Sequence, residues 1–349
     1  MSDLSPQRIA ELDASGMAAD IVSLPDHLRD ALWRVETAAI EPLDTPGGLV
    51  IAGMGGSAAG GMLAEAVLGD RATRPITVSR GYMLPSWISA NTTVLCSSYS
   101  GNTEETLAAY EAAGVIGTRR VVATSGGSIA DQARADEVPV IPLPGIFQPR
   151  CAVGYMLVAA LEAAYLAGAA ASIRTEVDVA AAHLEALAAS WGPAGPDDGE
   201  ARSLARALEG RIPMVLGADA TAGVAYRWKT QINENAEVPS FSAELPEADH
   251  NEIVCWAGAA DLGRFAVVVL GDSDSHPRER ARLDITAEMV QQAGIPVHRV
   301  ESRGETRIER ILSLVLMGDL VSFYLAIQRG VDPTPVKAID ELKGRLSAA

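Results

Sequence analysis

Short apolar runs alternate along the chain with longer segments in which apolar residues recur every three or four positions. The runs have the length and the β-branched content of buried strands, whereas the longer segments have the spacing of helices. In the first half of the chain, this pattern predicts strand–loop–helix units and single strands. They lie at 47–69, 75–80, 92–114, 119–135 and 138–144.

The alternation restarts after a segment rich in Gly, Pro and Asp at 190–203, which we interpret as a linker or surface insertion. Long Ala-rich helices are expected before it, at roughly 150–190. A last helix, after residue 333, places Ile339, Leu342 and Leu346 on one face. Between these, the pattern predicts strands at 211–218, 264–272 and 296–300 and helices at 221–237, 276–294 and 305–329.

These elements divide the chain into four parts. We expect an N-terminal helical segment at 1–45, a first α/β subdomain with its following helices at 46–189, the linker at 190–203, and a second α/β subdomain with a C-terminal helix at 204–349. Strands that alternate with helices form right-handed βαβ units and therefore parallel sheets. The predicted fold class is α/β, with two similar three-layer sandwiches in one chain.

The balance of charges narrows the choice of partners. With 45 acidic and 28 basic residues, the formal net charge is −17, and the chain has just three lysines, Lys229, Lys337 and Lys343. Nucleic acids and anionic membranes bind basic surfaces, so neither is an expected partner. A small phosphorylated ligand is compatible with this charge, because it interacts with its own pocket rather than with the whole surface.

Cysteine usage and the first residues indicate a reducing compartment. Cys96, Cys151 and Cys255 are odd in number and form no CxxC pair, so we expect free thiols. The polar stretch at 1–13 lacks the pattern of a signal peptide, and no apolar run reaches the ~18–20 residues of a membrane span. We therefore expect a soluble, cytoplasmic protein.

The loop GMGGSAAGG at 53–61 follows a predicted strand and opens a predicted helix. Its glycines allow the main chain to approach an anion, which the free N–H groups and the dipole of the helix start would bind. Gly56 and Ser57 are the candidate ligands here, and Ser57 adds a hydroxyl donor. A tight packing turn between strand and helix is the structural alternative.

The same loop fits the glycine fingerprint of dinucleotide-binding enzymes, with Gly53, Gly55 and Ala58 in the fingerprint positions. The next strand ends with Arg80 rather than with the acidic residue expected for NAD, although an arginine suits the extra phosphate of NADP. An NADP-dependent dehydrogenase is therefore an alternative on the evidence of this loop alone.

The segment SYSGNT at 98–103 places several hydroxyls, those of Ser98, Ser100 and Thr103, where a strand passes into a helix. Thr103 stands at the expected helix start, so a simple helix cap is the structural alternative. A cap uses one hydroxyl, however, and several neutral donors beside a helix N-terminus suit a phosphate monoester. A dinucleotide-binding enzyme would not need this second loop.

Together, the segments GMGGS, SYSGNT and ATSGG resemble the loops of the sugar isomerase (SIS) domain. More narrowly, the chain resembles the bifunctional phosphoglucose/phosphomannose isomerases of archaea and some bacteria, from about residue 45 to the C-terminus. The resemblance implies two SIS-type subdomains, each a parallel sheet flanked by helices. It also implies a sugar phosphate whose phosphate group contacts Gly56, Ser57, Ser98, Ser100 and Thr103.

Two residues carry the narrower resemblance. Glu234 lies in NENAE and His250 lies in HNEI, and in the family NEN supplies a base and HN supplies a histidine. Taken by themselves, a glutamate at a helix end and a lone histidine are usually solvated or structural. The resemblance implies that Glu234 is the catalytic base and that His250 acts in ring opening.

Aldose–ketose isomerisation needs these residue types. The sugar ring must open, and histidine titrates near neutrality, which suits proton transfer at the ring oxygen. A proton then moves between C1 and C2 through a cis-enediol, a task that suits a partly desolvated glutamate. The enediolate needs a fixed positive charge nearby. This route requires no metal and no cofactor.

The resemblance extends to two cationic residues. Arg150 in FQPR matches the family's arginine beside the enediolate; a surface salt bridge or a residue at a helix start is its structural alternative. Lys343 in AIDELKGRL matches the family's C-terminal lysine, which would lie near the ring oxygen with His250. Lys337, six residues earlier, is an alternative assignment. Without the resemblance, both lysines are typical of a solvated helix face.

The resemblance also implies a homodimer with shared active sites, in which the histidine comes from the other subunit. The chain departs from the family pattern in the loop GGSAAGG, at Glu237, where lysine is commoner, and at Asp249, where Asn is frequent. Extra negative charge at these two positions would bear on the titration of His250. The departures therefore concern specificity and efficiency more than reaction class.

The predicted function is the metal-independent interconversion of glucose 6-phosphate and mannose 6-phosphate with fructose 6-phosphate. One alternative is a non-catalytic SIS protein that senses sugar phosphates. It would keep the phosphate loops without needing Glu234 and His250, and it would usually accompany a basic helix-turn-helix, which the sequence lacks. The other alternative is an SIS isomerase of a different sugar phosphate.

Overall fold

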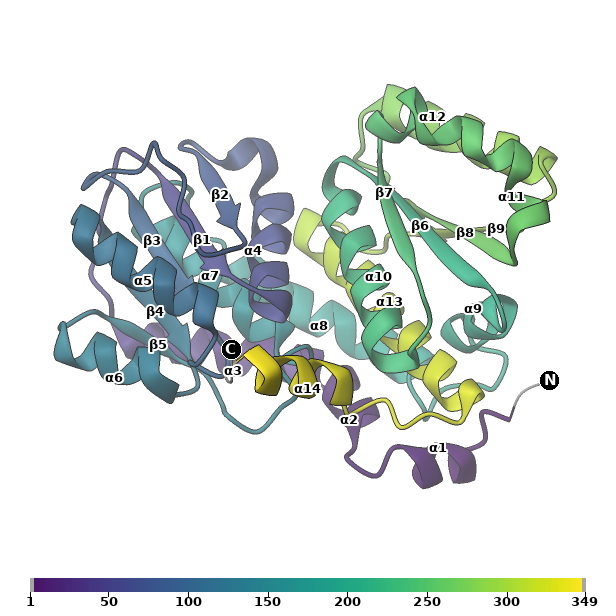
Figure 1. Cartoon of the computed structure of the whole chain (residues 1–349), viewed down its shortest axis with the longest axis horizontal. Coiled ribbons are helices and arrows are strands. Elements are labelled where there is room, and N and C mark those ends of the chain that lie inside the picture. The colour runs from purple at the N-terminus through teal and green to yellow at the C-terminus, as the bar shows by residue number, and fades with distance from the viewer. Residues whose placement is uncertain (1–2, 347–349) are drawn as a thin grey trace. The chain divides into compact units, whose positions relative to one another are not determined.

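Five short apolar runs form a parallel sheet in the computed structural model, which describes residues 3–346 (Figure 1). The strand order is β2-β1-β3-β4-β5, and the central pair is aligned so that Leu49 lies opposite Thr93 and Gly53 opposite Ser97. Every residue of these two central strands is buried, as expected for a parallel sheet with both faces covered. The strands are β1 (Leu49–Gly53), β2 (Ile76–Ser79), β3 (Thr93–Ser97), β4 (Arg119–Thr124) and β5 (Val140–Pro142).

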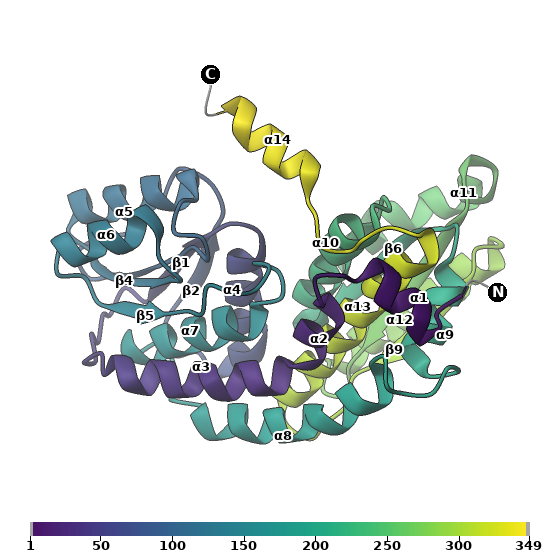
Figure 2. The ribbon, with the colours of Figure 1, turned by 90° about the horizontal axis from the view of Figure 1, so that it is seen from below.

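Helices cover both faces of this sheet (Figure 2). Helices α5 (Glu104–Ile116) and α6 (Gly127–Ala135) pack on one face, where alternate strand residues such as Val50 and Val94 contact them. The other face carries α4 (Gly55–Leu68) and α7 (Val153–Leu166), with α3 (Leu24–Ala38) packed on α7. The close contact of α4 with α7 depends on Gly60, because a Cβ there would lie 2.4 Å from the Met156 side chain.

A second parallel sheet has the strand order β7-β6-β8-β9. Its strands are β6 (Ile212–Ala218), β7 (Phe241–Leu245), β8 (Phe265–Gly271) and β9 (Val297–Glu301). Helix α12 (Pro277–Gln292) and the short α11 (Trp256–Leu262) bury one face, and α10 (Ala222–Ala236) packs on β6 and β7. Helix α13 (Arg307–Arg329) supports α10, since the Trp228 indole N–H donates to the Leu314 carbonyl at 2.8 Å.

The chain divides into two compact units. We call Ser23–Ala186 with Ser302–Ser313 the β1–β5 unit, and the rest of the described chain the β6–β9 unit. The remaining helices are α1 (Pro6–Leu12), α2 (Met17–Val22), α8 (Arg174–Trp191), α9 (Glu200–Leu208) and α14 (Lys337–Leu346).

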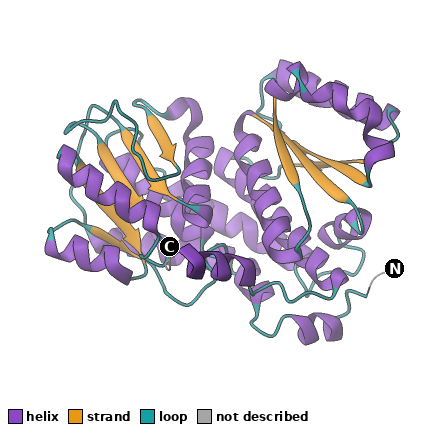
Figure 3. Cartoon of the chain, viewed as in Figure 1, coloured by secondary structure: helices purple, strands orange, loops and turns teal. Residues whose placement is uncertain are grey.

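The predicted α/β class with parallel sheets flanked by helices is confirmed (Figure 3). Three elements were not predicted: strand β7 and the short helices α9 and α11. In β7, Ala243 and Leu245 are buried while Phe241 and Glu244 are exposed, so this edge strand lacks the continuous apolar run by which the others were recognised. Part of the segment 190–203 is helical, since α8 continues to Trp191 and α9 begins at Glu200.

Among the described residues, α13 is the helix whose length and hydropathy would allow it to cross a membrane. This finding differs from the sequence-based expectation that no apolar run is long enough. Of its most apolar 18-residue window, 94% is buried inside the protein. We therefore interpret α13 as a core helix, a kind of element that passes the same test of length and hydropathy.

Candidate active site

The junction of β1 and α4 lies at the carboxyl edge of the first sheet, and two glycines there have no room for a side chain. A Cβ on Gly53 would lie 2.8 Å from the Ser97 carbonyl oxygen. A Cβ on Gly56 would lie 2.9 Å from the Pro149 carbonyl oxygen and 3.4 Å from the Arg150 Cα. The glycines therefore bring the main chain of Arg150 against the start of α4, beside the predicted phosphate loop.

Ser57 connects this loop to the hydroxyl-rich one. Its side chain is buried, and its Oγ accepts a hydrogen bond from the Tyr99 main-chain N–H at 3.3 Å. The two loops that sequence reasoning selected are thus neighbours at the edge of the sheet. This is the usual location of ligand sites in open parallel sheets, outside the carboxyl ends of the strands.

The hydroxyls of SYSGNT have different surroundings. Ser98 is buried; its hydroxyl donates to Thr103 Oγ1 at 2.9 Å and accepts from the Gly101 N–H at 3.1 Å. Ser100 is exposed, and its Oγ accepts from the Asn102 N–H at 3.3 Å. Thr103 occupies the N-cap position of α5 but makes no side-chain cap bond. The capping alternative for Thr103 is therefore wrong with respect to its hydroxyl.

A third loop, from Thr124 to Gly127, also lies at this carboxyl edge of the first sheet, next to SYSGNT. A Cβ on Gly101 would come within 1.7 Å of the Gly126 carbonyl oxygen, so the two loops touch main chain to main chain. Asn102 Oδ1 accepts from both the main-chain N–H and the hydroxyl of Ser128, at 2.9 and 3.0 Å, in the first turn of α6. The three loops hold one another, which gives a preorganised rim beside the N-termini of α4 and α5.

Arg150 lies in the turn between β5 and α7 and is 4% exposed. A surface salt bridge, one of its two structural alternatives, does not fit this burial, whereas the other, a residue near a helix start, is compatible with its place just before α7. The structure therefore brings together Arg150, Gly56, Ser57 and the SYSGNT hydroxyls within the β1–β5 unit. The other predicted residues, Glu234, His250 and Lys343, belong to the β6–β9 unit and lie on three different elements.

Glu234 sits in the last turn of α10 and is half-buried. The asparagines on either side of it have structural roles. Asn233 Oδ1 accepts from the Ser240 N–H at 2.8 Å, and Asn235 Nδ2 donates to Ser322 Oγ on α13 at 2.9 Å. The two amides hold the end of the helix to its surroundings, so the NEN pattern presents the carboxylate from a fixed helix end.

Helix α10 is held further by a buried ion pair. The Arg227 guanidinium contacts Asp319 of α13 in a bidentate arrangement, with Nε–Oδ1 at 3.0 Å and Nη2–Oδ2 at 2.6 Å. Both side chains are almost fully buried, at 1% and 8% exposure. Sequence reasoning missed this pair, because no local pattern relates two residues on helices so distant in the chain.

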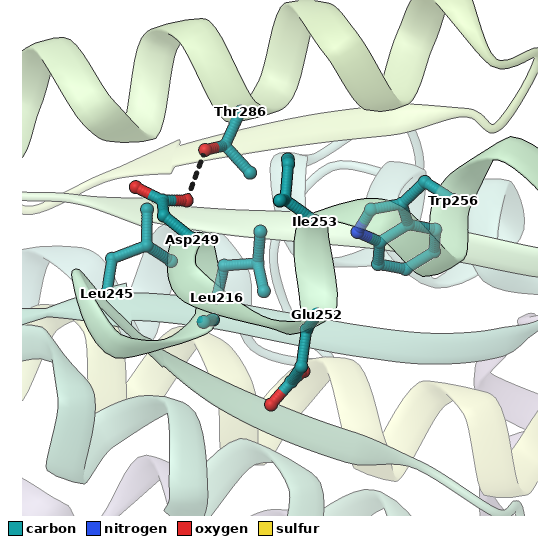
Figure 4. A pocket seen from close by; sticks show the side chains of 8 residues that line it. Leu216, Leu245, Asp249, Glu252, Ile253, Trp256 and Thr286 are labelled. Atoms are coloured by element: carbon teal, nitrogen blue, oxygen red, sulfur yellow. Dashed lines mark hydrogen bonds between the residues drawn. The ribbon is translucent and has the colours of Figure 1, made fainter.

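His250 ends a single 3₁₀ turn, Glu247–His250, and is exposed. The neighbouring Asp249 faces α12, where its carboxylate accepts from Thr286 Oγ1 at 2.8 Å and lies 3.3 Å from Arg282 Nη1 (Figure 4). Asp249 thus has partners of its own. Its charge is directed at Arg282.

Two pockets lie near this segment. The pocket drawn in Figure 4, between Asp249, Trp256 and the β6–β7 strands, has a volume of about 10 Å³, which is room for a water molecule at most. A larger groove of about 400 Å³ is lined mainly by apolar side chains, among them Phe241 and Leu262. It lacks the convergent polar groups that a sugar phosphate needs.

The C-terminal helix does not distinguish the two candidate lysines. No residue of α14 is buried, and both Lys337 and Lys343 are exposed. The predicted apolar face is present, with Ile339, Leu342 and Leu346 exposed to different degrees. The choice of Lys343 over Lys337 thus still rests on the family pattern.

Cys96, Cys151 and Cys255 are all free, as predicted. Cys96 lies on β3 just before SYSGNT, and complete burial raises the pKa of its thiol to about 12. The thiol next to the phosphate loop is therefore protonated and unreactive. Within residues 3–346, no three His, Cys, Asp or Glu side chains are grouped so that they could hold a metal ion.

Comparison with solved structures identifies the class to which this fold belongs. A hypothetical protein from Thermus thermophilus superposes with a TM-score of 0.74 at 15% identity, over 98% of this chain and 94% of that one. A glucose-6-phosphate isomerase like protein from the same organism gives 0.64 at 20% identity, over 99% of both chains. Residues 197–346 match the family described as bacterial phospho-glucose isomerase C-terminal SIS domain. The fold is that of the SIS class.

Sequence relatives narrow the class to a family. The bifunctional phosphoglucose/phosphomannose isomerase of Caldicellulosiruptor bescii is 37% identical over 95% of this chain and 99% of its own length. That of Aquifex aeolicus is 34% identical over 86% of this chain and 90% of its own. The chain belongs to the bifunctional phosphoglucose/phosphomannose isomerase family, as its loops and motifs predicted.

Proposed function

We propose that the protein is an aldose–ketose isomerase that interconverts glucose 6-phosphate and mannose 6-phosphate with fructose 6-phosphate. The observation that carries the proposal is the joining of Arg150 to the phosphate loops through Gly56. This contact brings a cationic residue next to an anion site, and the chain also has the family's glutamate and histidine. An SIS protein that only senses sugar phosphates has no need of this set.

The phosphate group is held at the edge of the first sheet. The main-chain N–H of Gly56 and the hydroxyls of Ser57, Ser98, Ser100 and Thr103 bind it, helped by the dipoles of α4 and α5. Neutral donors hold a dianion firmly enough for binding and still allow the product to leave. The support for this assignment is that these groups lie on adjoining loops beside two helix N-termini.

The proton chemistry is assigned to residues of the other unit and to Arg150. His250 and Lys343 exchange protons with the ring oxygen and with the hydroxyl of the anomeric carbon, and this opens the sugar ring. Glu234 removes the proton from C2 of the aldose and returns it to C1, so that the carbonyl moves from C1 to C2. Arg150 stabilises the negative charge of the cis-enediolate. The sequence of steps is redox-neutral overall and uses no metal and no cofactor.

The assembly proposed is a homodimer with shared active sites, acting in the cytoplasm on intermediates of carbohydrate metabolism such as glycolysis and gluconeogenesis. The apolar groove of the β6–β9 unit supports an interface, since Phe241 is 53% and Leu262 is 82% exposed. Light scattering should give twice the chain mass for the wild type. A monomer with full activity would contradict the shared site.

A coupled assay tests the reaction. The protein is treated with chelator and given fructose 6-phosphate, and glucose 6-phosphate and mannose 6-phosphate are measured separately. The proposal expects both products. Glucose 6-phosphate alone would mean that the C2 pocket selects one epimer. Neither product, with sugar-phosphate binding retained, would favour a sensor.

A further inference from the structure

Tyr99 lies between the two serines of SYSGNT and is 7% exposed. Its main chain joins the three loops of the sheet edge. The N–H donates to Ser57 Oγ at 3.3 Å, and the carbonyl accepts from the N–H and the hydroxyl of Ser125 at 3.1 and 2.6 Å. One residue therefore contacts the GMGGS loop and the loop after β4 while it belongs to the loop between them.

The phenol of Tyr99 contacts a fourth segment. Its hydroxyl donates to the Pro144 carbonyl at 2.6 Å and accepts from the Phe147 N–H at 2.9 Å. These main-chain groups belong to the connection between β5 and α7, which carries Arg150. The hydroxyl thus uses both its donor and its acceptor capacity on one segment.

The segment held in this way has little regular structure of its own. It runs from Leu143 to Ala152 between β5 and α7 as loop and turns. The Phe147 ring packs on His27 at a centroid distance of 4.4 Å, and Cys151 N–H donates to the Gln148 carbonyl at 2.9 Å. Phe147 therefore fixes the middle of this segment against α3, and a turn connects it directly to Arg150.

We propose that Tyr99 is a positioning residue that couples the hydroxyl-rich phosphate loop to the placement of Arg150 through its bonds to Pro144 and Phe147. Its relevance to catalysis rests on the proposed function. When a phosphate binds the SYSGNT loop and further limits its motion, the phenol transmits that restriction to the Arg150 segment. The arginine is then fixed where negative charge develops, while the phosphate contacts themselves do not involve the phenol.

The variant Tyr99→Phe isolates the phenol, because it keeps the ring and removes the hydroxyl. The proposal expects kcat to fall by about tenfold, as a misplaced catalytic group would cause. It expects the inhibition constant of inorganic phosphate to stay within about twofold of wild type, since the phosphate donors are untouched. The matched control is Tyr110→Phe on α5, which removes a phenol that donates to Asp136 at 2.9 Å and should leave both constants unchanged.

Hydrogen–deuterium exchange separates this proposal from the proposed function. In the wild type, saturating inorganic phosphate should slow exchange in both the 98–103 and the 143–152 peptides. In Tyr99→Phe, protection should persist in 98–103 and be lost in 143–152, and exchange of the second peptide should be faster even without phosphate. Equal protection of 143–152 in both proteins would overturn the coupling. A wild type without isomerase activity that shows this exchange pattern would refute the proposed function and leave the coupling intact.

Discussion

Gly56 and Arg150 are in main-chain contact: a Cβ at Gly56 would lie 3.4 Å from the Arg150 Cα and 2.9 Å from the carbonyl oxygen of Pro149. This contact is the physical link between the glycine-rich loop and Arg150, the arginine proposed to act in catalysis. A glycine at this position is therefore needed for the approach of two backbones rather than for an unusual backbone conformation, which Gly55 adopts at φ +52°.

The first prediction is that Gly56→Ala displaces the Arg150 turn. Overpacking against a main-chain oxygen should lower the free energy of unfolding by about 1–3 kcal/mol and reduce kcat. Gly258→Ala is the control, because a Cβ there meets nothing within 4 Å and, inside helix α11, the change should be neutral or stabilise by up to about 1 kcal/mol rather than destabilise. Chemical denaturation and steady-state kinetics measure both effects. Equal behaviour of the two variants would argue against the contact.

The second prediction concerns the phosphate site. Thr103→Val removes the hydroxyl and keeps the shape, and loss of a hydrogen bond to a charged phosphate should raise KM by about tenfold or more. Thr106→Val, one turn further along α5, is the control. The Thr106 hydroxyl is buried and has no hydrogen-bond partner among the described residues, so its removal should leave KM unchanged. If Thr103→Val keeps the wild-type KM, Thr103 does not bind the phosphate.

The third prediction concerns the buried Arg227–Asp319 ion pair, which holds helix α10 and so the position of Glu234. Asp319→Ala leaves Arg227 buried without its carboxylate, which should cost about 3–5 kcal/mol of unfolding free energy. The double variant Arg227→Met/Asp319→Leu should recover much of that loss. Asp284→Ala removes the partner of Arg299 in an exposed ion pair and should cost less than about 1 kcal/mol. Urea denaturation distinguishes these outcomes, and similar losses at Asp319 and Asp284 would refute the role of burial.

The fourth prediction is a pH dependence caused by His27. Burial lowers the pKa of this residue to about 4, although Asp26, a hydrogen bond with the Cys151 backbone, and Asp30 oppose the shift. The unfolded chain takes up the proton near pH 6.5, whereas the folded chain does so near pH 4. The histidine's stabilisation is therefore complete above pH 6.5 and is lost as the pH falls toward 4, by roughly 3 kcal/mol in total.

The variant His27→Phe tests this prediction, because it keeps an aromatic ring beside Phe147 and cannot titrate. Between pH 6.5 and 4.5 its unfolding free energy should decline less steeply than that of the wild type. Parallel curves for the two proteins would show that His27 is not the source of the dependence.

The sequence was sufficient to predict those elements whose signal is local. Continuous apolar runs such as 265–271 identified the buried strands, and glycine followed by hydroxyl residues identified the carboxyl-edge loops. The alternating FSAEL of β7 was missed, because an edge strand exposes every second side chain. The hydrogen bonds of the Tyr99 phenol to Pro144 and Phe147 could not be predicted either, because they join loops that lie 45 and 48 positions apart in the sequence. Lys337 and Lys343 stay undistinguished, because α14 buries neither.

The central claim is that Glu234 moves a proton between C1 and C2, and deuterium incorporation tests it most directly. Fructose 6-phosphate is incubated in D₂O with wild type, with Glu234→Gln and with Glu237→Gln, a control at an exposed carboxylate three residues away. NMR then follows solvent deuterium entering C1 of fructose 6-phosphate and C2 of the aldose phosphates, and a parallel titration measures the binding of inorganic phosphate. The account predicts incorporation by wild type and Glu237→Gln, and a loss of at least about a hundredfold in Glu234→Gln, with phosphate binding retained. Undiminished incorporation by Glu234→Gln would contradict it.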